Sequence, residues 1–138
     1  MTASFIIDCS ITMAWCFEEE ETKASTQIQD RLAVETALVP QLWFLEVANV
    51  LAMAEKRRRI TPAKSDEFIH LLQLMDIEVD VESPGRAFEH VFPLCRVYGL
   101  TSYDAVYLDV ALRNRLPLAT LDDDLRAAAR KAGVKLLY

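Results

Sequence analysis

Short apolar runs that alternate with longer helical patterns constrain the fold of this chain more than any other feature. Residues 4–7 are β-branched and aromatic, residues 77–81 alternate with period two, and residues 117–120 form another short apolar run. Strands that alternate with helices are joined by crossovers, which produce a parallel sheet with helices on both faces. The sequence therefore predicts an α/β fold around a central parallel sheet.

The remaining patterns place the other elements. The expected strands are 4–7, 37–39, 77–81, 117–120 and 134–137. The expected helices are 11–17 with Ser10 as its cap, 18–35, 42–58, 61–75, 86–98, 101–115 and 122–132. Pro93 should kink or divide the helix 86–98, because proline cannot donate a helical hydrogen bond. No linker interrupts the pattern, and 138 residues suit a single domain, 1–138.

Charge and composition exclude several classes of protein. A formal net charge of -6 argues against a general nucleic-acid-binding surface, which should be basic. It is compatible with an enzyme whose carboxylates hold a cation against a phosphate. No apolar run approaches the roughly 18 residues of a membrane span, and no signal peptide is expected, so the predicted location is cytoplasmic. Three cysteines without a C-x-x-C pair predict neither a disulfide framework nor a zinc site.

Glu46 is the acid that is hardest to explain as a surface residue. Within the apolar stretch 42–54, only Glu46 and Asn49 are polar, and their spacing of three places them on one helix face. A helix that is apolar all round is expected to be buried. No basic residue stands at a helical spacing from Glu46, and an unpartnered buried carboxylate is costly. We expect a distant side chain or a cation to satisfy it.

Three further acids stand where a shared site could form. Asp8 follows the first expected strand and Asp122 follows the run 117–120, so both lie at the strand ends where α/β folds bind ligands. Asp104 lies at the start of an expected helix. Each also has a simple structural explanation: Asp8 as a turn residue, Asp104 as a helix-dipole acid with Thr101 as the cap, and Asp122 as an N-cap. Together with Glu46 they offer the carboxylate oxygens that Mg²⁺ prefers.

Four segments of the chain resemble the motifs of PIN domains, and most closely those of the VapC-type toxins. The segments are 5–10 (Phe-Ile-Ile-Asp-Cys-Ser), Pro40 with 45–51 (Leu-Glu-Val-Ala-Asn-Val-Leu), 100–108 (Leu-Thr-Ser-Tyr-Asp-Ala-Val-Tyr-Leu), and 118–122 (Leu-Ala-Thr-Leu-Asp) followed by Leu125. Their order and spacing cover essentially the whole chain. The resemblance implies a three-layer α/β/α sandwich around the parallel sheet.

The resemblance also implies an activity, a cofactor and partners. It implies Mg²⁺- or Mn²⁺-dependent cleavage of RNA by water, and a toxin of a type II toxin–antitoxin pair that forms a homodimer and is neutralised by a cognate antitoxin protein. The implied catalytic and metal-binding residues are Asp8, Glu46, Asp104 and Asp122. The implied accessory polar residues are Ser10, Asn49 and Thr120. Asp123 and Asp124 are interpreted as helix-dipole acids beside the quartet.

A basic run follows the apolar helix. It consists of Lys56, Arg57, Arg58 and Arg59. These side chains are candidate contacts for an RNA backbone, or they complement the dipole at a helix C-terminus. Trp15 and Trp43 could stack on bases, but core packing is the favoured interpretation.

Two other functions compete with a ribonuclease. A phosphatase similar to the haloacid dehalogenases would use Asp8 as its nucleophile, but that family wants a second Asp where this chain has Ser10. A non-catalytic PIN-like scaffold that only binds a partner would be expected to have lost some of the four acids.

Overall fold

A four-stranded parallel sheet forms the centre of the computed structural model, which describes residues 2–138. Its strands are β1 (Phe5–Ile7), β2 (Ala37–Pro40), β3 (Ile77–Asp80) and β4 (Leu118–Ala119), in the order β3-β2-β1-β4. All three strand pairs are parallel. The prediction of an α/β fold around a parallel sheet is confirmed.

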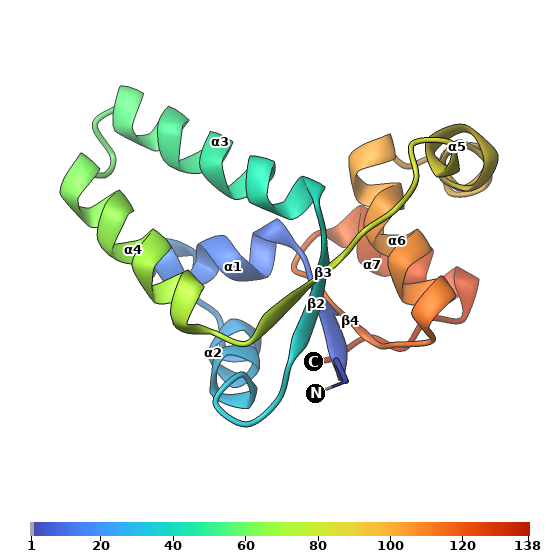
Figure 1. The fold of residues 1–138 in the computed structure, drawn as a ribbon, viewed down its shortest axis with the longest axis horizontal. Helices are drawn as coiled ribbons and strands as arrows, with labels where there is room; N and C mark the ends of the chain where they lie inside the picture. The colour runs from blue at the N-terminus through green and yellow to red at the C-terminus, as the bar shows by residue number, and fades with distance from the viewer. Residues whose placement is uncertain (1) are drawn as a thin grey trace.

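Helices cover both faces of the sheet. They are α1 (Cys9–Cys16), η1 (Glu18–Glu20), α2 (Lys23–Arg31), α3 (Leu42–Lys56), α4 (Pro62–Leu74), η2 (Ala87–Val91), α5 (Phe92–Tyr98), α6 (Ser102–Asn114) and α7 (Asp123–Ala132). Figure 1 shows α1 to α4 on one side of the sheet and α5 to α7 on the other, which is the expected three-layer sandwich. Among residues 2–138, no helix combines the length and the apolar character that crossing a membrane requires.

The structure changes several of the expected helix boundaries. Asp8, and not Ser10, caps α1, because its Oδ1 accepts the backbone N–H of Ile11 at 3.1 Å. The expected helix 18–35 is a short 3₁₀ turn followed by α2, which Thr22 caps. Pro93 lies in the first turn of α5, directly after the π-helical turn η2, so the expected division of 86–98 is confirmed.

The expected C-terminal strand 134–137 is wrong. Only Leu136 pairs with the sheet, in a single parallel bridge to Leu118 at the β4 edge. Because β4 itself is two residues long, it offers too short a ladder for another strand. Two backbone hydrogen bonds make up this bridge. Leu118 N–H donates to Lys135 O, and Leu137 N–H donates to Leu118 O.

Helix α3 is buried on one side only, so the expectation of a helix buried all round is wrong. Trp43, Val47 and Leu51 pack into the core at helical spacing. Phe44 and Leu45 lie on the other side, where Leu45 is 71% exposed. Trp43 is buried as expected and donates its Nε1–H to Thr12 Oγ1 at 2.9 Å, which ties α3 to α1.

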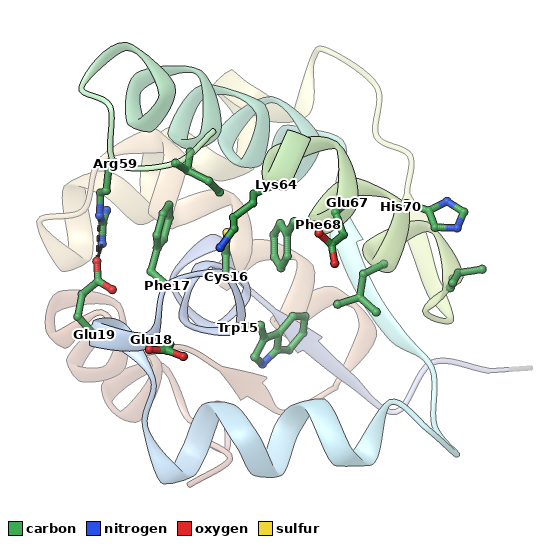
Figure 2. Close-up of a pocket in the computed structure, with 13 residues that line it drawn as sticks. Trp15, Cys16, Phe17, Glu18, Glu19, Arg59, Lys64, Glu67, Phe68 and His70 are labelled. Atoms are coloured by element: carbon green, nitrogen blue, oxygen red, sulfur yellow. Dashed lines mark hydrogen bonds and ion pairs between the residues drawn. The ribbon is translucent and has the colours of Figure 1, made fainter. Parts of the chain in front are cut away.

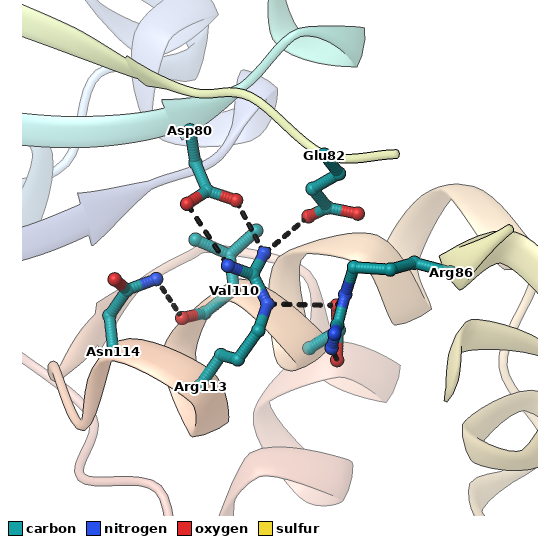
Figure 3. A network of polar contacts seen from close by, with 7 residues as sticks. Asp80, Glu82, Arg86, Val110, Arg113 and Asn114 are labelled. Atoms are coloured by element: carbon teal, nitrogen blue, oxygen red, sulfur yellow. Dashed lines mark hydrogen bonds and ion pairs between the residues drawn. The ribbon is translucent and has the colours of Figure 1, made fainter. Parts of the chain in front are cut away.

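A network of ion pairs holds α6 against the edge of the sheet. The Arg113 guanidinium of α6 contacts Asp80 at the end of β3 and Glu82 beyond it, as Figure 3 shows. Arg86 binds Asp109, one turn before Arg113, with an N–O distance of 2.8 Å. These contacts fix the position of α6, the helix whose first turn contains Asp104.

Candidate active site

Asp8 lies at the carboxyl end of β1, a central strand of the sheet, and its carboxylate accepts three hydrogen bonds. Oδ1 accepts the Ser10 hydroxyl at 2.7 Å and the Ile11 N–H at 3.1 Å, and Oδ2 accepts the Thr120 hydroxyl at 2.5 Å. The residue is 5% exposed. Burial raises the pKa of Asp8, the three donors counteract this, and the neighbouring charge of Asp122 raises the pKa further.

Thr120 links Asp8 to Asp122. It follows β4, the strand beside β1, and its Oγ1 accepts the backbone N–H of Asp122 at 3.0 Å. Asp122 caps α7 by accepting the Leu125 N–H at 2.8 Å, so the expected N-cap role is confirmed. Capping uses Oδ2 and leaves Oδ1 for a further contact. The parallel pairing of β1 with β4 thus brings two acids that are far apart in sequence to one edge.

Glu46 reaches the site from α3, on the opposite side of the sheet from α6. Its Oε1 accepts the hydroxyl of Tyr107 at 2.5 Å, and Tyr107 is 1% exposed. Burial raises the pKa of Glu46, the Tyr107 hydrogen bond lowers it, and the charges of Asp8 and Asp104 raise it. Burial and the Glu46 contact raise the pKa of Tyr107 above its usual range, so its hydroxyl remains a donor. Of the two expected ways to satisfy Glu46, a distant side chain or a cation, the structure shows the first, with Tyr107 as the side chain.

Asp104 stands in the first turn of α6, where Thr101 is the cap, as expected. Within residues 2–138 its carboxylate accepts no hydrogen bond. Burial, followed by the charges of Asp122, Asp8 and Asp124, raises the pKa of Asp104 to about 6. A carboxyl that titrates this close to neutrality is suited to exchange protons with a substrate or a water molecule.

No Lys, Arg or His side chain within residues 2–138 neutralises the negative charge of the four acids. None of them takes part in an ion pair in the part of the chain that the structure describes. Burial, with the charges of Glu46 and Asp8, raises the pKa of the neighbouring Cys9 thiol to about 12. No three His, Cys, Asp or Glu side chains of residues 2–138 converge closely enough to ligate one ion directly. Magnesium is commonly held by one or two carboxylates and several waters, so the donor set fits a hard divalent cation.

The accessory residues divide into two groups. Ser10 and Thr120 lie within the site, since both donate to Asp8 and Ser10 Oγ also accepts the Leu121 N–H at 2.9 Å. Asn49 lies one turn beyond Glu46 but is exposed, and in the described residues it makes no hydrogen bond to the acids.

Sequence reasoning missed Tyr107. Its position three residues after Asp104 on one helix face, and the need of a buried hydroxyl for a partner, were the available signals.

The basic run lies away from the acids. Lys56 is ten residues beyond Glu46, which is about 15 Å along α3. Arg59 pairs with Glu19 and Glu20, and its guanidinium lies 3.8 Å from the centre of the Phe17 ring. Figure 2 shows Arg59 and Glu19 at the rim of a hollow of about 670 Å³ between α1 and α4. None of the four acids lines this hollow.

The sequence matches the family model of the PIN domain over residues 5–131. No curated protein sequence matches the chain. Several solved structures share its fold. PAE2754 from Pyrobaculum aerophilum has a TM-score of 0.69 and 23% identity, over 93% of this chain and 87% of that one. A toxin–antitoxin complex from Klebsiella pneumoniae gives a TM-score of 0.67 at 20% identity, over 98% of both chains. FitAcB from Neisseria gonorrhoeae gives 0.67 at 14% identity, over 97% of this chain and 96% of that one.

Proposed function

The chain belongs to the PIN domain family, and from this we propose that it is a metal-dependent endoribonuclease that acts as the toxin of a toxin–antitoxin pair. The observation that carries the proposal is the cluster of four acids at the ends of β1 and β4 and on the facing helices α3 and α6. Burial is the main cause that raises the pKa of Asp8, Glu46 and Asp104, and repulsion by neighbouring acids raises the pKa of each further. A divalent cation, Mg²⁺ or Mn²⁺, would turn this repulsion into attraction.

The cation would lie among Asp8, Glu46, Asp104 and Asp122, with one or two of these carboxylates binding it directly and the others through its water molecules. When bound, it would supply positive charge against the phosphate and lower the pKa of a water molecule. The protein's own part begins with Asp8, which Ser10 and Thr120 hold in one orientation. A carboxylate held in this way does not have to reorient during the reaction, so little free energy is lost to reorganisation.

Asp104 is the acid that we assign to the attacking water. Its carboxylate accepts no hydrogen bond within residues 2–138, so both oxygens are available to a water molecule. Asp104 would orient the water in line with the scissile bond and accept its proton. The expected products are a 5′-phosphate and a 3′-hydroxyl.

The partners that we propose are an antitoxin and a second copy of the chain. The first rests on the match, over nearly the full length of both chains, to a protein described as part of a toxin–antitoxin complex. The second rests on exposed aromatic side chains: Phe88, Phe92 and Tyr103 line one hollow of about 470 Å³ and are all largely exposed. Exposed apolar surface of this kind marks an interface.

Two alternatives receive less support. A phosphatase of that class would want a second Asp two residues after Asp8, but this position holds Ser10, which donates its hydroxyl to Asp8. A non-catalytic scaffold would not need to maintain four mutually repelling acids.

Incubation of the pure protein with mixed cellular RNA and Mg²⁺, followed by mapping of the cut ends, tests the proposal. We expect discrete cuts that a chelator abolishes and that Mg²⁺ or Mn²⁺ restores. Asp8→Asn should be inactive, whereas Asp123→Asn, the same chemical change at an exposed acid, should cut like the parent. Cleavage that continues in the chelator, or in Asp8→Asn, would exclude this mechanism.

A further inference from the structure

Tyr107 is the one side chain within residues 2–138 that hydrogen-bonds Glu46. The bond joins Tyr107 Oη to Glu46 Oε1 at 2.5 Å and spans 61 positions of sequence. Tyr107 stands one turn after Asp104 on α6, so a single helix carries both an acid of the site and the partner of another acid. The contact therefore couples α3 and α6 at the acidic site.

The contact has a parallel elsewhere in the site. Asp8 is held by the hydroxyls of Ser10 and Thr120, and Glu46 is held by the hydroxyl of Tyr107. A glutamate has one more rotatable bond than an aspartate and swings through many orientations when it is unrestrained. A donor on Oε1 restricts this motion and leaves Oε2 available.

We propose that Tyr107 is a positioning residue, whose hydroxyl fixes Glu46 so that the second carboxylate oxygen is available to the divalent cation. This inference rests on the proposed metal-dependent function. The competing explanation is that Tyr107 is only a core residue that satisfies its own hydroxyl. Loss of the hydroxyl would affect stability in both cases, but only a positioning role affects metal affinity through Glu46.

The test measures the binding of Mn²⁺ alone to the purified chain by calorimetry. Partners that orient metal ligands typically contribute tenfold or more to affinity, so Tyr107→Phe should weaken Mn²⁺ binding about tenfold. The metal-free melting temperature should fall under either explanation, because the variant removes the hydrogen bond to Glu46, so only the Mn²⁺ affinity discriminates between them. Tyr103→Phe is the matched control, because it removes the same atom from an exposed tyrosine of the same helix, and its affinity should stay within twofold of the parent.

A double variant tests whether Tyr107 acts through Glu46. In the Glu46→Gln background, Tyr107→Phe should cause little further loss of Mn²⁺ affinity. Unchanged affinity in Tyr107→Phe would overturn the positioning role, and so would an equal loss in both backgrounds. A parent that binds no Mn²⁺ at all would instead refute the proposed function, and the positioning role with it.

A proton NMR measurement covers the case in which Tyr107→Phe does not fold. The Tyr107 hydroxyl proton of the metal-free parent should resonate far downfield, because its acceptor is a charged carboxylate. In Glu46→Gln it should move upfield. A signal that does not respond to Glu46→Gln would overturn the proposal.

Discussion

Removal of the Asp104 charge should stabilise the metal-free protein. The carboxylate is held close to other acids and is half-buried, so its pKa rises from 3.8 to about 6. At about 1.4 kcal/mol for each pKa unit, ionisation of Asp104 in the folded state costs about 3 kcal/mol before solvent screening is considered. Because the side chain is partly exposed, screening reduces this to about 1.5 kcal/mol.

The net gain from Asp104→Asn is smaller, because the acid also favours the first turn of α6. Loss of that interaction with the helix dipole reduces the gain in the free energy of unfolding by about 0.5 kcal/mol. We expect Asp104→Asn to be more stable than the parent by about 1 kcal/mol at pH 7.5 without metal. For a chain of this size, that corresponds to about 4 °C in melting temperature.

The pH dependence follows from the direction of the pKa shift. In the unfolded chain Asp104 ionises near pH 3.8, and in the folded chain near pH 6. Well below pH 3.8 both states are protonated and the charge costs nothing. As the pH rises from about 4 to 6, the parent loses stability relative to the variant. The advantage of Asp104→Asn should therefore appear over this window and stay constant above it.

Thermal melts in a chelating buffer at pH 4 and pH 7.5, at matched ionic strength, measure the effect. Asp123→Asn is the control, because it removes an exposed acid from the first turn of α7. Mg²⁺ at ten times its dissociation constant should stabilise the parent by about 1.4 kcal/mol, and the Asp104 variant by much less. The reasoning would be refuted if Asp104→Asn were no more stable than the parent at pH 7.5. It would also be refuted if the stability difference between variant and parent were the same at pH 4 as at pH 7.5.

Three further outcomes test individual contacts. Thr120→Val removes a donor from the buried Asp8 carboxylate and should lower the free energy of unfolding by about 1–3 kcal/mol in urea titrations. Arg113→Met leaves Asp80 and Glu82 without their cation and should cost about 2 kcal/mol in the same assay, whereas the exposed Arg115→Met should be nearly neutral. If the basic run guides RNA, Arg57→Gln should weaken RNA binding and flatten its salt dependence without affecting Mn²⁺ affinity.

Local sequence patterns were sufficient to predict the class of fold and the positions of several candidate acids relative to strands and helices. Alternation of strand and helix patterns predicted the parallel sheet, and Thr101 and Asp122 were predicted caps that the structure confirms. Strand ends locate Asp8 and Asp122, because the carboxyl ends of parallel strands meet at one edge. These inferences depend on groups a few positions apart, whose geometry local hydrogen bonds and helical period determine.

Contacts between distant segments required the tertiary structure. Nothing near Glu46 in sequence indicates that Tyr107 is its hydrogen-bond partner, since the two helices lie on opposite faces of the sheet. The apolar composition of α3 predicted burial on every side, but the chain supplies a cover for only one side, and Leu45 remains exposed. The last expected strand failed because pairing depends on the length of its neighbour. The local sequence pattern around a residue determines which helix or strand it belongs to. Its contacts with distant residues depend on how the helices and strands pack, and packing is a property of the whole chain.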